Sequence, residues 1–344
     1  MRNIVIDLER LKYPNTGLYS FCKDLGRELI NKNKDFDLEL YLPKGNEALF
    51  NTKKYFFTKS IDKFVNPKRN TSWHLTNQLA YTGNLNCNNL LTIHDLNFLI
   101  EKKNNPKKIK IYLDKIQKNI NKCDYIVCIS NFVLNQVTQN FRVENKNISV
   151  IYNGCSLTKY PEFSSPKYNP KSNFFFSIGT ILKKKNFHVL SALLINNENE
   201  LIIAGSIIDK NYYSEIISYA KKIGVEKRVH IIGTISEEEK YWYYNNCEAF
   251  VFTSLAEGFG LPVIEAMKLG KPVYLSKLNS LPEIGSDLAF YFDGFDPESM
   301  LQTLNNSIPT TLDKHFSSKI ISHANQFTWE KAAVSYLEKY KEMV

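Results

Sequence analysis

The chain has 344 residues, a length that predicts about two domains. Hydrophobic residues make up 43% and charged residues 23%, which excludes a wholly disordered chain, a collagen-like repeat and a small disulfide scaffold. The formal net charge is +9, and the excess is confined to residues 1–152, where 24 basic side chains face 14 acidic ones, against 20 and 21 in residues 153–344. Nucleic acid, an anionic membrane surface, an anionic substrate and a solubilising surface are the competing explanations.

The first residues and the cysteines indicate the compartment. The apolar run 4–6 is too short for a signal-peptide core, and Asp7 interrupts it. No stretch approaches the roughly 18 apolar residues that a spanning helix needs. The cysteines are scattered without a C-x-x-C pair, which favours a reducing compartment, and we expect a cytoplasmic protein. The six cysteines are Cys22, Cys87, Cys123, Cys128, Cys155 and Cys247. The histidines lack metal-ligand spacing, so no metal is expected.

Short apolar runs alternate with helical patterns along the whole chain. The predicted strands are residues 3–7, 37–42, 90–93, 125–129, 148–151, 174–178, 200–204, 229–232, 249–253, 272–275 and 289–292. The predicted helices include residues 17–32, 107–121, 131–140, 211–223, 236–245, 262–269 and 328–341. The apolar runs are continuous, which indicates strands buried on both faces. This alternation predicts an α/β fold with doubly wound parallel sheets.

A boundary follows the fifth predicted strand. Residues 153–172 contain three prolines and several serines, as an interdomain linker does, and the charge balance changes sign at the same place. We therefore expect an N-terminal Rossmann-like domain over residues 1–152 and a C-terminal one over 173–327, facing each other across a cleft. The last helix, in residues 328–344, has a periodicity that fits packing on either domain, including a return to the first.

The segment 249–275, AFVFTSLAEGFGLPVIEAMKLGKPVYL, is the most informative part of the sequence. A buried strand ends, a loop with Gly258 and Gly260 follows, and a helix begins near Pro262. Glycines let the backbone approach a ligand, and the helix start points its N–H groups at the same place, which predicts a phosphate site. The carboxylates of Glu257 and Glu265 would be repelled by a phosphate and suit neutral hydroxyls better.

This segment resembles the signature of retaining GT-B glycosyltransferases of family 4, in which two glutamates are separated by seven residues. Five other stretches resemble motifs of the same family in the same order. They are residues 93–98 (IHDLNF), 129–133 (ISNFV), 150–154 (VIYNG), 178–188 (IGTILKKKNFH) and 279–283 (NSLPE), with residues 15–19 a weaker seventh match. The I-H-D-L and G-T forms resemble bacterial mannosyl- and rhamnosyltransferases of surface polysaccharides.

The resemblance implies roles for the residues around the helix start. Glu257 would contact hydroxyls of the donor sugar, and Glu265 would accept hydrogen bonds from the ribose hydroxyls. The backbone N–H groups of Phe259, Gly260 and Leu261 would hold the sugar and the pyrophosphate.

Other segments complete the implied site. Lys184 and Lys185 would neutralise the diphosphate, and Gly179 would belong to the donor site. His94 would lie near the donor sugar and the acceptor, and Gly17 would leave room for the phosphates. Relatives often carry arginine at Thr180 or Lys184 and more glycine around Gly17, so this chain would hold its phosphates with lysine point charges.

The lysines also fit an anion site on physical grounds. Lys183, Lys184 and Lys185 precede a predicted helix start near Asn186, and cations at the positive end of a helix are unfavourable alone. A docked anion would resolve the conflict, although solvated lysines would be tolerated too. Lys183 is expected to be a surface residue.

Eight lysines gather in residues Lys102–Lys122, where Ile109, Tyr112, Leu113, Ile116 and Ile120 form one apolar stripe. The sequence predicts a basic amphipathic helix docked on its own domain through that stripe. Its lysines could also contact anionic lipid, at about 1 kcal/mol per lysine. This second interpretation would place the protein peripherally on the inner face of the membrane.

Together these patterns predict a retaining hexosyltransferase that uses a nucleotide-diphosphate sugar, with GDP-mannose favoured, in surface polysaccharide or lipopolysaccharide synthesis. The acceptor would be a glycan or a lipid-linked glycan, and no cofactor or metal is expected. A sugar-nucleotide epimerase of similar architecture is the alternative. Nucleic-acid binding is disfavoured because no aromatic residues are interleaved with the lysines. A dinucleotide oxidoreductase would need a G-x-G-x-x-G after the first strand, which is absent.

Overall fold

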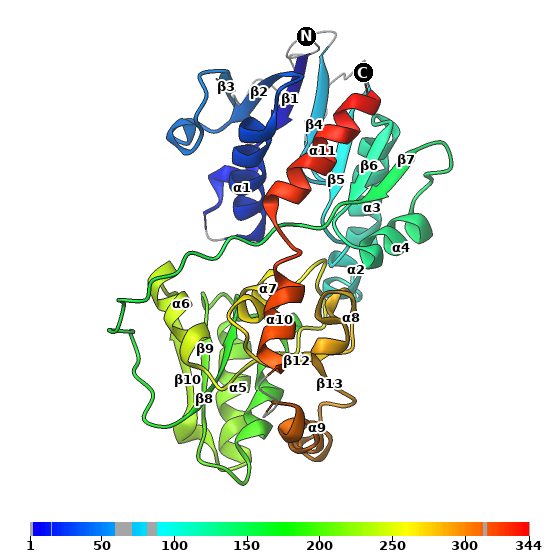
Figure 1. Cartoon of the computed structure of the whole chain (residues 1–344). Coiled ribbons are helices and arrows are strands. Elements are labelled where there is room, and N and C mark those ends of the chain that lie inside the picture. The colour runs from blue at the N-terminus through cyan, green and yellow to red at the C-terminus, as the bar shows by residue number, and fades with distance from the viewer. Residues whose placement is uncertain (1–2, 15, 59–70, 81–87, 312–314, 344) are drawn as a thin grey trace. The chain divides into compact units, whose positions relative to one another are not determined.

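The computed structural model describes residues 3–14, 16–58, 71–80, 88–311 and 315–343. The described chain forms two compact units (Figure 1). The first comprises residues 1–156 and 327–344, and the second residues 157–326. Cys87 and Asn15, which the sequence analysis discusses, lie outside the described residues.

A parallel seven-stranded sheet forms the centre of the first unit (Figure 1). Its strand order is β3-β2-β1-β4-β5-β6-β7, in which β1 pairs with both β2 and β4, as a doubly wound sheet requires. The strands are β1 (Asn3–Asp7), β2 (Asp37–Leu42), β3 (Tyr55–Phe57), β4 (Ser72–Leu75), β5 (Leu90–Ile93), β6 (Tyr125–Cys128) and β7 (Asn147–Val150). Five of them were predicted within one residue, whereas β3 and β4 were not.

Five α-helices of this unit lie within the described residues. They are α1 (Gly17–Lys32), α2 (Phe98–Glu101), α3 (Pro106–Asn121), α4 (Asn131–Asn140) and α11 (Trp329–Met343). Side chains cap three of them. Thr16, Asn105 and Ser130 each accept a hydrogen bond from a backbone N–H in the first turn of α1, α3 and α4.

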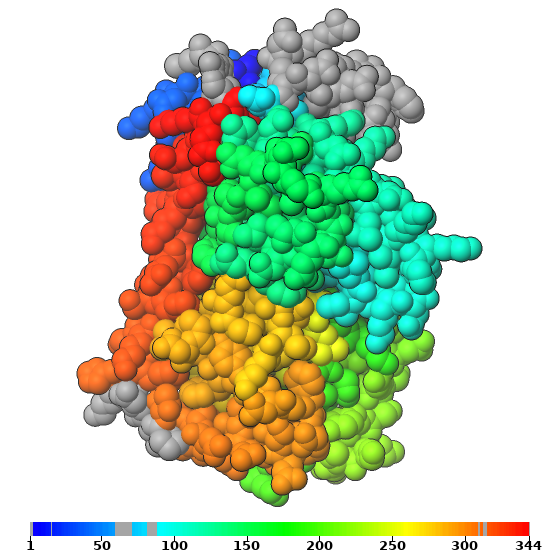
Figure 2. Space-filling view, turned by 90° about the vertical axis from the view of Figure 1, so that its right-hand side faces the viewer, coloured from blue at the N-terminus to red at the C-terminus, as the bar shows by residue number. Residues whose placement is uncertain are grey.

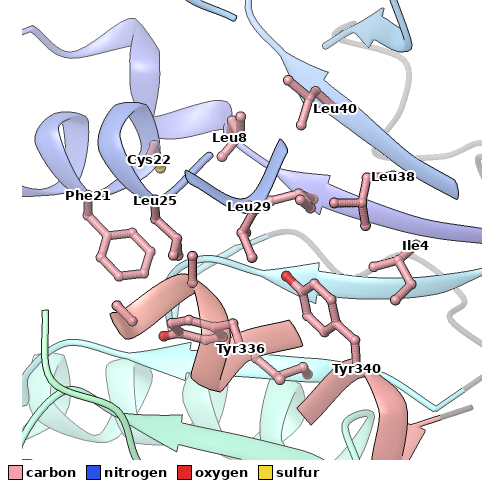
Figure 3. Packing of buried hydrophobic residues seen from close by; sticks show 14 of the residues in the cluster. Ile4, Leu8, Phe21, Cys22, Leu25, Leu29, Leu38, Leu40, Tyr336 and Tyr340 are labelled. Carbon is pink, nitrogen blue, oxygen red and sulfur yellow. The ribbon is translucent and has the colours of Figure 1, made fainter. Parts of the chain in front are cut away.

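The C-terminal helix α11 packs on α1 in the first unit (Figure 1). Figure 3 shows Tyr336 and Tyr340 turned toward the apolar side chains of α1 and of the sheet. Their hydroxyls join a buried network. Tyr340 lies 2.6 Å from Nδ1 of His74, whose Nε2 lies 2.8 Å from the Thr92 hydroxyl, and that hydroxyl lies 3.0 Å from Tyr336. Polar residues in β4 and β5 therefore bind the last helix.

The second unit contains a parallel six-stranded sheet of order β10-β9-β8-β11-β12-β13. Its strands are β8 (Phe174–Ile178), β9 (Glu200–Ala204), β10 (Val229–Gly233), β11 (Ala249–Phe252), β12 (Val273–Ser276) and β13 (Phe290–Phe292). Its α-helices are α5 (Lys210–Lys222), α6 (Glu237–Asn246), α7 (Leu261–Lys268), α8 (Leu281–Gly285), α9 (Pro297–Thr311) and α10 (Phe316–Ala324). The predicted α/β class and the two Rossmann-like sheets are confirmed. That the two units face each other across a cleft stays a prediction.

The predicted linker, residues 153–172, is held by hydrogen bonds over part of its length. Residues 157–172 are part of the second unit and are held there by backbone hydrogen bonds. The N–H of Lys167 donates to Glu239 at 2.7 Å, and the N–H of Tyr168 donates to the Tyr243 hydroxyl at 3.0 Å. Part of this proline- and serine-containing segment therefore lies against its own unit.

Two further facts concern the cysteines and the helices of the described residues. The five cysteines among the described residues are free thiols, and all five are buried. Within the described ranges, no helix is both long enough and apolar enough to cross a membrane.

Candidate functional site

The signature loop, residues 253–260, connects the carboxyl end of β11 to the start of α7. Its first part is attached to the lysine turn, residues 183–185, which follows β8. The N–H of Leu255 donates to the carbonyl of Lys184 at 2.7 Å, and the Thr253 hydroxyl donates to the carbonyl of Asn186 at 3.1 Å. Ser280 fixes the last part, because its buried hydroxyl donates to the carbonyl of Phe259 at 2.9 Å. Both segments are thus held at the same edge of the sheet.

The lysine turn precedes a helix that starts next to Asn186, as predicted, but this helix is a 3₁₀ helix rather than an α-helix. Lys183–Lys185 form a single 3₁₀ turn, and Asn186 adopts a left-handed conformation with φ of 57° before a second 3₁₀ segment, Phe187–Leu194. The side chain of Lys183 is 75% exposed, so its assignment to the surface is confirmed. Lys184 is half-buried.

Lys185 reaches from this turn into the signature loop. Its ammonium forms an ion pair with the Glu257 carboxylate and lies 4.8 Å from the centre of the Phe252 ring. The two side chains of the pair are 14% and 15% exposed. A hydrogen-bonded ion pair that is so little exposed orients both side chains. The structure thus brings two of the predicted site residues into direct contact. The sequence analysis had inferred a docked anion beside the lysines, and the Glu257 carboxylate supplies a negative charge to Lys185.

Glycine is required at two points around this pair. Gly179 follows β8 with φ of +155°, and a Cβ there would lie 3.3 Å from Cε of Lys185. Gly260 precedes α7 with φ of +113°, in the left-handed region that glycine favours. No side chain caps α7, so a ligand can meet the positive end of the helix at Leu261.

Glu265 lies in α7, five residues beyond Gly260. Its Oε1 is 3.0 Å from the ammonium of Lys240, and its Oε2 accepts a hydrogen bond from the Tyr244 hydroxyl at 2.9 Å. Burial alone would lower the pKa of Lys240, but the carboxylates of Glu265 and Glu237 outweigh burial and raise this pKa well above its usual range. Lys240 therefore stays charged beside Glu265.

His94 and Gly17 belong to the first unit. His94 is buried at the end of β5, where its Nε2 lies 2.8 Å from the carbonyl of Thr76. A carbonyl can only accept, so Nε2 carries the proton and Nδ1 is left as an acceptor. Burial lowers the pKa of His94 to about 4, so the ring is neutral near pH 7. Gly17 is the first residue of α1, and a Cβ there would meet open space. Their place in the donor site stays a prediction.

Sequence reasoning missed Ser280, Lys240 and Tyr244. Ser280 was visible only as part of the 279–283 motif, and Tyr244 only as one of four consecutive aromatic residues. Lys240 had no signal beyond its spacing of four residues from Tyr244, which places both on one face of a helix. Their relation to Glu265 depends on how α6 packs on α7. Among the described residues, no group of three or more His, Cys, Asp or Glu side chains could hold a metal ion.

Comparison with known proteins finds matches to both halves of the chain. A model of glycosyl transferases group 1 matches residues 159–308, and a model of glycosyltransferase family 4 matches residues 22–159. The solved structures of sucrose-phosphate synthase from Thermosynechococcus elongatus and of Anabaena HepE in complex with UDP and glucose superpose with TM-scores of 0.74 and 0.72. Each match covers 99% of this chain and at least 99% of the other, at 15% and 14% identity, so the likeness is one of fold.

Two relatives are similar in sequence. O-antigen chain mannosyltransferase B of Escherichia coli is 24% identical over 266 residues, which cover 73% of this chain and 69% of that protein. O-antigen chain mannosyltransferase RfbU of Salmonella typhimurium is 24% identical over 222 residues, which cover 64% and 60%. Because the two family models together span residues 22–308 across both Rossmann-like units, the chain belongs to the family 4 glycosyltransferases of GT-B fold.

Proposed function

We propose that this glycosyltransferase moves a hexose from a nucleotide-diphosphate sugar to a glycan or lipid-linked glycan acceptor, with retention of anomeric configuration. The process it serves would be the synthesis of a surface polysaccharide or lipopolysaccharide. The observation that carries the proposal is the Lys185–Glu257 pair at the uncapped start of α7. The pair offers an ammonium to a diphosphate and a carboxylate to sugar hydroxyls, side by side.

The pair suits a reaction in which charge develops on the leaving group. The bond between the anomeric carbon and the diphosphate breaks, and the acceptor oxygen forms its bond to that carbon on the same face. The acceptor proton passes to the departing diphosphate oxygen, so no protein carboxylate attacks the sugar. Lys184, Lys185 and the N–H groups at the start of α7 would stabilise the developing negative charge. His94, neutral at pH 7, would serve as a hydrogen-bonding group for sugar or acceptor.

GDP-mannose is the donor we favour, because both of the relatives described above are named as mannosyltransferases. A uridine nucleotide is the competing choice, since HepE was solved with UDP and glucose. A panel of GDP- and UDP-sugars, read out by the shift in thermal unfolding, separates them. We expect one nucleotide sugar to raise the melting temperature, as a ligand that binds only the folded state must. A shift with a polynucleotide and none with any nucleotide sugar would refute the proposal.

A sugar-nucleotide epimerase of similar architecture is the second candidate. It would convert the donor into an isomer without an acceptor and without transfer. Mass spectrometry and NMR of the donor, incubated alone and with acceptor, distinguish the two. Our proposal predicts release of nucleoside diphosphate that increases with acceptor, and no isomeric nucleotide sugar.

The proposal includes transfer without a metal ion, since lysines and helix N–H groups supply the positive charge. We expect transfer to persist within about twofold after exhaustive dialysis against EDTA, because the counter-charge is covalently part of the chain. A loss of activity that Mg²⁺ or Mn²⁺ restores would show that a metal carries part of this role.

Contact with an anionic membrane is the last part of the proposal. Six lysines around α3 are exposed, and none forms an ion pair with another described residue; we call them the basic face. They are Lys103, Lys107, Lys108, Lys110, Lys115 and Lys118. Ile111 lies among them and is 53% exposed, while Ile116 and Ile120 are buried on the opposite side. In Figure 2 the cyan segment containing the start of α3 lies at the surface. Lys102 and Lys122 are half-buried and do not contribute.

Vesicle binding tests this contact. Replacing Lys107, Lys110 and Lys118 by glutamine should weaken binding to vesicles containing phosphatidylglycerol roughly 100-fold, because each lysine contributes about 1 kcal/mol near such a surface. The matched control replaces Lys221, Lys222 and Lys227, which are exposed on the second unit, and should bind as wild type. Equal loss in both variants would mean that only the net charge matters.

A further inference from the structure

Both signature carboxylates meet an ammonium in the structure, but the two ammonium groups differ in origin. Lys185 lies in a family motif, whereas Lys240 lies in α6 and belongs to none of the stretches that carry the resemblance. Lys240 and Tyr244 are four residues apart and contact opposite oxygens of the Glu265 carboxylate, at 3.0 and 2.9 Å. Glu265 is thus held at both oxygens by one helix.

Helix α6 is itself firmly held. Ser236 and Glu239 form a capping box at its start, with both reciprocal hydrogen bonds present. Tyr244 is fully buried, with its ring 5.1 Å from that of Phe176 and 5.3 Å from that of Phe250. Tyr243 donates to the carbonyl of Tyr168 at 2.8 Å. The two groups that contact Glu265 therefore come from a preorganised support.

The side chains of Glu265 and Lys240 are 14% and 15% exposed, so a ligand can reach the carboxylate at one edge. An ionised carboxylate near a diphosphate would repel it unless a cation stood beside it. Lys240 supplies that cation, although it also forms an ion pair with the more exposed Glu237 at 2.8 Å, and it leaves remaining lone pairs of both Glu265 oxygens available. Such a carboxylate can accept two hydrogen bonds from a vicinal diol while Lys240 offsets part of its charge.

We propose that Lys240 is a positioning residue that orients Glu265 and offsets its charge for recognition of the ribose 2′,3′-diol of the donor nucleotide. The inference rests on the proposed function, since it requires a nucleoside diphosphate as ligand. It makes Lys240 a determinant of ribonucleotide over deoxyribonucleotide binding, and it makes Tyr244 the second, weaker support of the same carboxylate.

The test compares GDP with 2′,3′-dideoxy-GDP, and UDP with 2′,3′-dideoxy-UDP, by isothermal titration calorimetry on the full chain. Lys240→Met should weaken binding of the ribonucleotide about tenfold, the factor that 1.4 kcal/mol represents, and change that of the dideoxy form less than about twofold. Lys240→Arg should restore most of the discrimination. Asn245→Ala, at an exposed position of the same helix, is the control and should match wild type.

The outcomes separate the claims. An equal loss for both nucleotides in Lys240→Met, or no loss for either, overturns the role of Lys240 alone. Binding of the dideoxy form also reports folding, and Tyr244→Phe, which should weaken only the ribonucleotide by about threefold, gives a second variant if Lys240→Met does not fold. A wild-type chain that binds neither GDP nor UDP overturns the proposed function together with this inference.

Discussion

Glu257 and Glu265 enter the candidate site as members of ion pairs, with Lys185 and Lys240 respectively. Sequence reasoning identified the carboxylates and foresaw their conflict with a phosphate. It could not find that each has its own counter-charge, because both partners are distant in sequence, 72 residues for Lys185 and 25 for Lys240. Each ion pair lowers the repulsion that a phosphate would meet at the carboxylate.

Lys185→Ala tests the role of the first pair. Transfer should fall about 100-fold, as for loss of one preorganised charge-stabilising group, while binding of the free nucleoside stays within about twofold. Lys183→Ala is the matched control from the same turn, because Lys183 is exposed, and its turnover should be that of wild type. Steady-state kinetics and calorimetry provide both readouts. Unchanged turnover in Lys185→Ala, or equal loss in the control, would remove Lys185 from the mechanism.

Buried titratable groups in the first unit predict a pH dependence of stability. Burial lowers the pKa of His74 to about 3 and that of His94 to about 4, so between these values and 6.5 only the unfolded chain binds their protons. Stability is therefore lost as pH falls below 6.5. Burial raises the pKa of Asp7 to about 7, which acts in the opposite direction above pH 4. With two histidines opposed by one aspartate, the unfolded chain binds about one proton more than the folded chain. The free energy of unfolding therefore falls by roughly 1.4 kcal/mol per pH unit as the pH is lowered.

His74→Gln should abolish most of this slope between pH 4.5 and 6.5. Only His94 and Asp7 then remain, and the proton that the unfolded chain binds at His94 is offset by the one that the folded chain holds at Asp7. Urea unfolding at a series of pH values measures the slope in both proteins. A variant whose slope equals that of wild type would mean that the buried His74 is not the proton-linked group.

At the scale of elements, long apolar strands were predictable and short or polar ones were not. The run Ile4–Ile6 needs only burial on both faces to form β1. Strand β3 has three residues, and β4 carries His74 at its centre, which is stable there because Tyr340 and Thr92 satisfy both ring nitrogens. That compensation comes from α11, at the other end of the chain. These contacts place α11 in the first unit, but they join residues far apart in the sequence. The periodicity of the last helix holds no information about them, so it left the position of that helix open.

The chain passes twice between the units, and the two crossings are in close contact. The N–H of Cys155 donates to the carbonyl of Phe327 at 3.2 Å. A Cβ on Gly154 would lie 2.1 Å from the backbone nitrogen of Trp329, so no other residue fits without displacing the start of α11.

Gly154→Ala should therefore destabilise the first unit by about 2–4 kcal/mol, as overpacking against a fixed backbone does. Differential scanning calorimetry measures the loss. Gly224→Ala is a useful comparison because it has open space but a φ of +76°, so it incurs backbone strain without a clash and should cost about 1 kcal/mol. A smaller effect at Gly154 than at Gly224 would contradict the close approach of the two crossings.

At the scale of the molecule, the charge asymmetry can be divided between two places. The first unit carries the +10 excess, six of whose lysines form the basic face, while the second unit has almost no net charge yet contains the lysines paired with the signature carboxylates. Net charge thus points to a surface property, whereas the candidate chemistry depends on individual placements. The sequence motifs located that chemistry because they fall on strand ends and helix starts of a sheet that is common to the family.

The central claim is retaining transfer from a nucleotide sugar, and NMR of the first-formed product tests it most directly. The donor selected by the thermal panel is incubated with the enzyme, and the anomeric signal of the transferred or hydrolysed sugar is followed before it can equilibrate. The account predicts a product with the anomeric configuration of the donor, formed by wild type and lost in Lys185→Ala. A product of inverted configuration, or an unaltered rate in the variant, would contradict it.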